Sequence, residues 1–350
     1  MAFAELWSLE MLVAAFAGGA FSATVGALPS FSLAGLMVIV GELYKLGART
    51  VGVETLPVDI TGSMAFGVVL GPHVAFGGGA AALAYASKRG YLDTEFEYHQ
   101  AKEVTRGLGS RPDVLAVGGA FGIIGYWTAT TAATVGVPVD PVALGVAVSA
   151  LAHRLAFGYS LIGAAPNRWF DMTPYERATT DGEPMADGGS TTVEPWLPYQ
   201  YRWSHVLSLG VLVGVLGAYV AYLTASAFLV FGISVVVLFL LNADVAEIPV
   251  THDITLPAST AVLALVDAPL TQLTPSLVAT SVPLWIALVV GAGFGLVGAF
   301  FGEVLQRVFY AHAETHLDPP AASIIVTSLL IGLLAMSGLL ASPVWVPTPG

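Results

Sequence analysis

Residues 206–243 read VLSLGVLVGVLGAYVAYLTASAFLVFGISVVVLFLLNA and contain no charged side chain. A helix needs roughly 20 apolar residues to cross the hydrocarbon core of a bilayer, so this run is long enough for two crossings. Four further uncharged runs are near or beyond the length of one crossing: 11–41, 114–139, 284–302 and 319–350. The sequence therefore predicts an all-α polytopic membrane protein, multi-pass and located in the cell membrane.

The composition supports this class and excludes others. Of the 350 residues, 56% are hydrophobic and only 10% are charged, against roughly 25% charged in a typical soluble protein. The net charge of −12 provides no basic surface for nucleic acid. The absence of cysteine excludes disulfides and thiolate metal sites. The partner predicted from composition is the lipid bilayer, and the acidic bias of the aqueous segments is typical of halophilic proteins.

The N-terminal residues carry Glu5 and Glu10 but no Lys or Arg before position 45. A cleaved signal peptide begins with a positively charged region, so we expect a retained first helix here.

Small residues recur along the chain at positions i, i+4 and i+7, which share one face of a helix. Three triplets consist of glycine alone and a fourth is looser: Gly118/Gly122/Gly125, Gly210/Gly214/Gly217, Gly291/Gly295/Gly298 and Gly19/Ala23/Gly26. The simplest interpretation is close packing of membrane helices, and such faces also allow assembly into a homo-oligomer.

Two short motifs follow these triplets in alternation. In chain order, the triplets that begin at Gly19 and Gly210 are followed by Asp59-Ile-Thr61 and Asp253-Ile-Thr255. Those that begin at Gly118 and Gly291 are followed by Asp140-Pro141 and Asp318-Pro319. The chain is therefore expected to form two homologous membrane repeats, residues 8–163 and 205–342. Between them, residues 164–204 are rich in Pro, Gly and acidic side chains and are expected to form an aqueous linker. Tandem halves of this kind recur in secondary transporters, which place the substrate site at the repeat interface.

The distribution of Lys and Arg favours inverted repeats. Short cytoplasmic loops collect basic residues. The loop after the second apolar run and the loop 88–111 both contain Lys and Arg, whereas the corresponding loops of the second half contain none. Placing both 45–49 and 88–111 on the cytoplasmic side conflicts with an odd number of crossings per half, unless 58–87 is broken or re-entrant near Gly71-Pro72. The sequence therefore predicts about ten transmembrane segments with broken or re-entrant helices.

Polar residues within these segments are candidates for a substrate or ion site, because a charge inside the bilayer is costly. In one interpretation Asp59 and Asp253 face each other across the repeat interface and bind a cation or proton. Neutral oxygens would complete such a site, and hard cations prefer oxygen ligands. The hydroxyls that could supply them are those of Thr61, Ser63, Thr255, Ser259 and Thr260. In the alternative interpretation, Asp59, Asp140, Asp253 and Asp318 simply cap helix N-termini.

Two further candidates are basic. His73 follows Gly71-Pro72 and precedes a glycine-rich run, so it could carry protons or gate a pathway, or simply be a buried core histidine. Arg154 lies within an apolar stretch. It could extend to the interface, pair with an acid such as Asp59 or Glu42, or hold a substrate carboxylate or phosphate.

His312, His316 and Asp318 suggest a weak metal site. Histidines at i and i+4 share a helix face and Asp318 could add a third ligand, which would allow an intramembrane enzyme. Glu314 lies at the wrong spacing for the metalloprotease pattern, however, and a solvated helix end explains the run as well.

The sequence as a whole favours a membrane transporter or channel for a small solute or ion. Proton or sodium coupling is expected rather than ATP, because no phosphate loop, nucleophile elbow or dinucleotide motif is present. No enzymatic activity and no cofactor are expected. The alternative is a non-transporting membrane scaffold that oligomerises or binds lipid or pigment.

Overall fold

The computed structural model describes residues 6–52, 57–93, 100–163, 169–180 and 193–349, and this part of the chain is helical, without strands. Glu5, one of the two acidic residues of the N-terminal segment, lies outside the described residues; Glu10 lies in the first turn of α1. The α-helices in chain order are α1 (Leu9–Val25), α2 (Ala27–Thr50), α3 (Ala75–Lys88), α4 (Pro112–Val135), α5 (Pro141–Phe157), α6 (Thr173–Thr180), α8 (Trp203–Thr224), α9 (Leu229–Val236), α10 (Phe239–Asn242), α11 (His252–Leu263), α12 (Pro275–Ser281), α13 (Leu284–Phe309) and α14 (Pro319–Met336).

Five of these helices, α2, α4, α8, α13 and α14, are long and apolar enough to cross a membrane. They contain 18 to 26 residues, which corresponds to about 27 to 39 Å of helix, against a hydrocarbon core of roughly 30 Å. The all-helical class predicted from the uncharged runs is confirmed.

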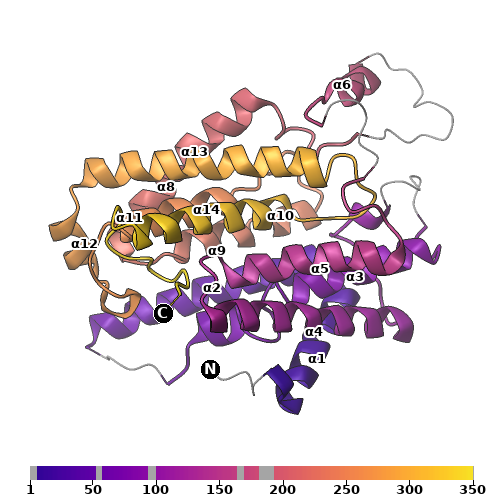
Figure 1. Cartoon of the computed structure of the whole chain (residues 1–350), viewed down its shortest axis with the longest axis horizontal. Coiled ribbons are helices and arrows are strands. Elements are labelled where there is room, and N and C mark those ends of the chain that lie inside the picture. The colour runs from indigo at the N-terminus through magenta and orange to yellow at the C-terminus, as the bar shows by residue number, and fades with distance from the viewer. Residues whose placement is uncertain (1–5, 53–56, 94–99, 164–168, 181–192, 350) are drawn as a thin grey trace.

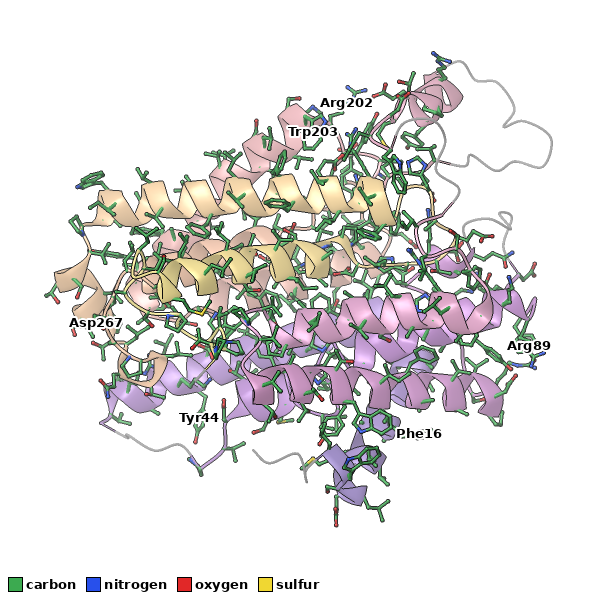
Figure 2. All side chains as sticks on the ribbon, viewed as in Figure 1. Phe16, Tyr44, Arg89, Arg202, Trp203 and Asp267 are labelled. Carbon is green, nitrogen blue, oxygen red and sulfur yellow. The ribbon has the colours of Figure 1, made fainter. Side chains whose placement is uncertain are left out.

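The long helices lie side by side and the bundle has two ends (Figure 1). We call one the linker end, where α6 and the segments 89–93 and 310–318 lie. The other is the tail end, where α12 and the C-terminal segment 337–349 lie. Arg89 and Arg202 lie toward the linker end, whereas Tyr44 and Asp267 lie toward the tail end (Figure 2).

Glycine determines how two helix pairs cross. On α1 and α4, Gly19 packs against the backbone of Gly118 and Gly122. On α8 and α13, Gly214 packs in the same way against Gly291 and Gly295. A Cβ atom at any of these positions would meet backbone atoms of the opposite helix, so the helices could not approach this closely with larger residues. The packing interpretation of the glycine triplets therefore holds.

Residues 57–88 form one interrupted segment that runs along the bundle. They start near Lys45 at the tail end, pass through a π-helical turn at Thr61–Ala65, and continue after an irregular segment as α3 to the linker end. Residues 45–49 therefore lie at the opposite end of the bundle from the described residues of 88–111, an arrangement in which a membrane across the bundle would separate the two. The break at Gly71-Pro72 interrupts this segment without reversing the direction of the chain.

The last part of the predicted aqueous linker packs against the bundle. Val193, Leu197 and Tyr201 are buried, and the Trp196 backbone N–H donates a hydrogen bond to the side chain of Gln306 on α13 (2.8 Å). Residues 164–168 and 181–192 of the linker lie outside the described residues.

A buried ion pair joins this segment to the loop before α4. The Lys102 ammonium lies 3.6 Å from a Glu194 carboxylate oxygen and 4.4 Å from the centre of the Tyr310 ring. Burial lowers the pKa of Lys102 to about 8, although the Glu194 carboxylate acts in the opposite direction. These contacts attach the linker to the end of α13.

Candidate functional site

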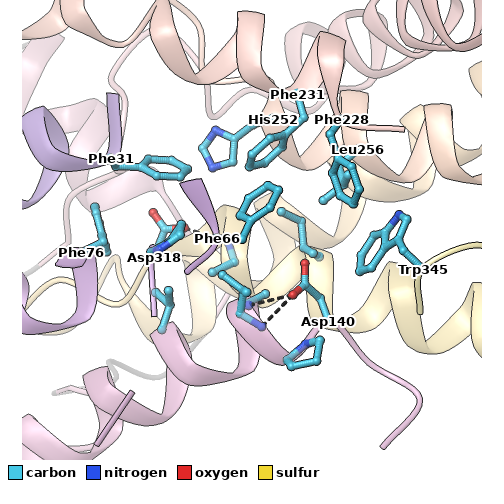
Figure 3. Close-up of a pocket in the computed structure, with 17 residues that line it drawn as sticks. Phe31, Phe66, Phe76, Asp140, Phe228, Phe231, His252, Leu256, Asp318 and Trp345 are labelled. Carbon is cyan, nitrogen blue, oxygen red and sulfur yellow. Dashed lines mark hydrogen bonds between the residues drawn. The ribbon is translucent and has the colours of Figure 1, made fainter. Parts of the chain in front are cut away.

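A cavity of about 240 Å³ lies where four helices begin (Figure 3). α5 runs from this cavity toward the linker end and α14 runs from it toward the tail end, so the cavity lies between the two ends of the bundle. α3 and α11 also begin at its wall. The residues that line it are Phe31, Phe66, Pro72, Phe76, Asp140, Pro141, Val142, Ala143, Val146, Phe228, Phe231, His252, Leu256, Asp318, Ala321, Ile324 and Trp345.

Two aspartates at helix N-termini provide the carboxylates of the cavity. One Asp140 oxygen accepts hydrogen bonds from the backbone N–H groups of Val142 (2.7 Å) and Ala143 (3.1 Å). The other oxygen of Asp140 points into the cavity (Figure 3). Asp318 accepts from the N–H of Ala321 (2.8 Å). The capping interpretation is confirmed for both residues, and capping leaves a carboxylate oxygen of Asp140 available to a ligand.

Aromatic rings form most of the remaining wall. They come from α2, α3, α9, the irregular segment before α3 and the C-terminal segment. The ring centres of Phe66 and Phe231 are 5.8 Å apart and those of Phe31 and Phe231 are 6.3 Å apart. The wall is thus apolar except at its carboxylates and one histidine.

That histidine is His252, the first residue of α11. Its ring meets Phe31 and Phe231 edge to face, with centres 5.1 and 5.9 Å apart. The side chain is almost fully buried, and its Nδ1 atom has no hydrogen-bond partner within the described residues. A buried polar atom without a partner is rare, and here it lies at a cavity that a ligand could fill.

The C-terminal segment closes the cavity toward the tail end. Trp345 donates its indole N–H to the Thr260 hydroxyl (2.9 Å) and its ring packs 5.5 Å from that of Phe228. The backbone N–H of Ala341 donates to the carbonyl of Ala264 on the loop after α11 (2.9 Å). This segment therefore forms part of the cavity wall.

A second, smaller cavity of about 30 Å³ contains two acids. Asp253 and Glu303 both line it, beneath Trp196 and Gln200 of the linker. Glu303 also forms a 2.6 Å ion pair with Arg307. A polar space of this size is large enough for one water molecule.

The predicted pair of Asp59 and Asp253 does not form. Asp59 has a half-exposed side chain near the tail end and lies 3.0 Å from the Lys45 ammonium. Asp253, in contrast, is buried beside Gly302 of α13. The two Asp-Ile-Thr motifs are not structurally equivalent, because one begins a π-helical turn and the other begins an α-helix.

Asp59 instead belongs to a network around a buried glutamate. Glu42 accepts hydrogen bonds from Thr61 (2.8 Å), Ser226 (2.6 Å) and Lys45 (3.1 Å), and so joins α2, the π-helical turn and the segment before α9. Partial burial raises the pKa of Asp59, but the Gly62 N–H and the Lys45 ammonium outweigh burial and hold that pKa below its ordinary value. Capping is confirmed for Asp59, whose side chain accepts from Gly62 (3.0 Å).

Of the five predicted neutral oxygen ligands, Ser63 is exposed, and the other four form hydrogen bonds within the protein. Thr61 donates to Glu42, as above. The Thr255 hydroxyl lies 3.2 Å from that of Ser234, and the Ser259 hydroxyl lies 2.8 Å from the Ala227 carbonyl. Asp253 is not a cap, because Thr251 holds the N-cap position of α11. The residues of α11 that reach the large cavity are His252 and Leu256.

His73 is buried beside the cavity wall. Its backbone carbonyl packs against Gly125 of α4 and its Nδ1 has no hydrogen-bond partner within the described residues. The neighbouring Pro72 lines the cavity.

Arg154 is fully buried and does not extend to an interface. Its guanidinium donates to the Thr315 hydroxyl (2.9 Å) and to the carbonyls of Leu161 (2.6 Å), Phe309 (2.8 Å) and Thr315 (2.8 Å). These contacts join α5 to the loop after α13. The alternative pairing with Asp59 or Glu42 does not occur, since both acids lie in the network at the tail end.

The weak metal site is not assembled. Residues 310–318 are not helical, so His312 and His316 do not share a helix face. The His312 ring faces the carbonyl of Trp169 (3.3 Å), whereas His316 lies 3.4 Å from Asp318. Within the described residues, no three His, Asp or Glu side chains could hold one metal ion.

Comparison with known proteins gives a family for this chain. No curated protein and no solved structure matches it. One family model does, and the match covers residues 1–349. The chain therefore belongs to the family described as a family of unknown function, DUF7973.

Proposed function

We propose that the protein is a membrane transporter or channel for a small solute or ion, and that the large cavity is its binding site. The observation that supports this most is the position of the cavity. It lies between the ends of the bundle, where four helices begin. Helix breaks at this depth are tolerated where they line a cavity, and secondary transporters place substrate sites at such breaks.

We further propose that residues 8–163 and 205–342 are inverted repeats. Equivalent helices from the two halves pack antiparallel. Gly35 of α2 meets Val235 of α9, and Val38 meets Gly232. On the other pair, Asp140 at the start of α5 donates its N–H to Ser328, in the second half of α14 (2.8 Å). Antiparallel equivalents are expected from a two-fold axis in the membrane plane.

The glycine triplets support the same alignment. Gly125 ends the triplet of α4 and packs against the carbonyl of His73, while Gly298 ends the triplet of α13 and packs against the carbonyl of Asp253. In this alignment of the repeats, the first-half residue equivalent to Asp253 is therefore His73 and not Asp59. The caps Asp140 and Asp318 are likewise equivalent, and both line the cavity.

The proposal includes about ten membrane segments and a definite orientation. The shorter apolar helices α1, α3, α5, α9 with α10, and α11 would add to the five long ones. Basic residues gather in cytoplasmic loops, so the linker end, which carries Lys88, Arg89, Arg106, Arg111 and Arg202, would face the cytoplasm.

Coupling to protons or sodium would involve the small cavity. Asp253 lines it together with Glu303, while the preceding residue, His252, lines the large cavity. Asp253 and His252 are neighbours in the first turn of α11, so they provide a short polar connection between the small and the large cavity. Buried ionisable residues in membrane segments commonly form such relays.

Flux into liposomes that contain the full-length protein tests the proposal. A panel of inorganic ions, organic ions and small metabolites is compared with protein-free liposomes. Val146→Trp fills the cavity and is expected to reduce any wild-type flux at least tenfold. Leu212→Trp is the control, because Leu212 lies 70% exposed on α8 and away from the cavity.

Two outcomes would contradict the proposal. Unchanged flux in a folded Val146→Trp variant would show that solutes do not pass through this cavity. Absence of wild-type flux for every solute would favour a scaffold that binds lipid or pigment in the cavity.

A further inference from the structure

We propose that the large cavity binds one small organic cation, with an ammonium group between the aromatic rings and the carboxylates of Asp140 and Asp318. This inference names the substrate class of the site proposed above and rests on that proposal for transport, though binding can be tested without it.

The aromatic wall is the first argument. Phe31, Phe66, Phe76, Phe228, Phe231 and Trp345 come from five separate segments and enclose one volume. Aromatic rings attract cations through their negative faces, and several rings around one space are the usual recognition site for quaternary ammonium groups. A strongly hydrated metal ion would gain little from such a wall, because it requires about six oxygen ligands.

The balance of charge at the cavity is the second argument. Each helix N-terminus contributes roughly half a positive charge, so the four helices that begin here contribute about two. Asp140 and Asp318 on the wall contribute two negative charges when ionised, which balance this positive contribution. Among the described residues no Lys or Arg lines the cavity. The wall therefore presents two carboxylates to a cation, whereas an anion would meet no cationic side chain on it.

The available hydrogen-bonding atoms are the third argument. The second oxygen of Asp140 points into the cavity, and His252 presents an imidazole whose Nδ1 has no partner within the described residues. These two groups come from different halves of the chain. They can orient the polar end of a cation whose apolar part contacts the rings.

The size of the cavity agrees with this class. A volume of about 240 Å³ exceeds that of an inorganic ion and suits a molecule of modest size. Choline is therefore a suitable probe: it combines a trimethylammonium group with one hydroxyl. Its neutral carbon isostere, in which a tert-butyl group replaces the trimethylammonium group, has nearly the same shape without the charge.

The test is calorimetric binding of both probes to the purified full-length protein. Choline is expected to bind at least tenfold more tightly than the isostere. The double variant Asp140→Asn/Asp318→Asn should bind choline at least tenfold more weakly than the wild type, because asparagine can still cap each helix but carries no charge. Asp113→Asn is the matched control, since Asp113 lies in the first turn of α4, outside the cavity.

A Phe231→Leu variant provides a second test that retains both carboxylates. Choline affinity should fall severalfold, whereas affinity for the isostere should change little. Equal binding of the two probes, or unchanged choline binding in the double variant, would overturn the inference, as would absence of choline binding to folded wild-type protein.

These outcomes are separable from failure of the transport proposal. Choline binding without flux would retain the cation site and reject transport, whereas flux of another solute without choline binding would retain transport and reject the cation site.

Discussion

Replacing Arg154 with methionine is expected to prevent most of the protein from reaching its folded state. The Arg154 side chain is fully buried and its guanidinium holds three backbone carbonyls and one hydroxyl between α5 and the loop after α13. Each buried polar group left without a partner costs about 1–3 kcal/mol, so the loss should reach or exceed about 4 kcal/mol. The measurement is the fraction of monodisperse protein after purification, followed by its thermal unfolding.

Arg154→Lys should rescue little of this stability, because one ammonium cannot reach acceptors arranged around a planar fork. Arg49→Met is the control, since Arg49 lies in the last turn of α2 outside these contacts. An Arg154→Met protein that unfolds at the wild-type temperature would show that the cluster contributes no stability.

Gly295→Leu is expected to have the second largest effect, through the crossing of α8 and α13. A side chain at Gly295 would meet the carbonyl oxygen of Gly210 and the backbone of Gly214. The helices must then separate along their whole contact, which costs several times the roughly 1–3 kcal/mol of ordinary overpacking. Loss of monodisperse protein, or a strongly lowered unfolding temperature, is the expected result.

The same helix provides a matched control two residues away. A side chain at Gly293 would meet nothing within 4 Å. Gly293→Leu should therefore behave like the wild type. Equal stability of the two variants would contradict the proposed role of the glycine face.

Sequence patterns predicted the class of fold well, because uncharged runs and evenly spaced glycines are local features. A run such as 206–243 can satisfy its backbone in lipid only as helix. The triplet at Gly291, Gly295 and Gly298 must lie on one helix face whatever that face contacts. The segment broken at Gly71-Pro72 was also predicted, since proline removes a backbone donor.

The candidate site was harder to predict because it depends on which segments meet. Asp140 and Asp318 are far apart in the chain, and only the antiparallel packing of α5 and α14 places both at one cavity. The repeated Asp-Pro dipeptide was the available signal, but it was explained by capping alone. Phe66 and Trp345 carry no helical periodicity, so nothing local indicated that they share a wall.

Arg154 illustrates a different difficulty. A lone arginine in an apolar stretch is compatible with an interfacial, paired or ligand-binding role. Its actual partners are backbone carbonyls, among them those of Phe309 and Thr315, and every segment of a chain has such groups. The side chains along the sequence therefore do not indicate which carbonyls Arg154 contacts.

Chemical modification inside the cavity tests the central claim most directly. Because the chain contains no cysteine, an Ile324→Cys variant carries a single thiol, placed on the cavity wall by α14. Leu333→Cys is the control, since Leu333 lies half-exposed farther along the same helix. The account predicts that a bulky, water-soluble thiol reagent modifies Ile324→Cys and stops solute flux in liposomes, while Leu333→Cys keeps its flux. Full flux through a quantitatively modified Ile324→Cys protein would contradict the account.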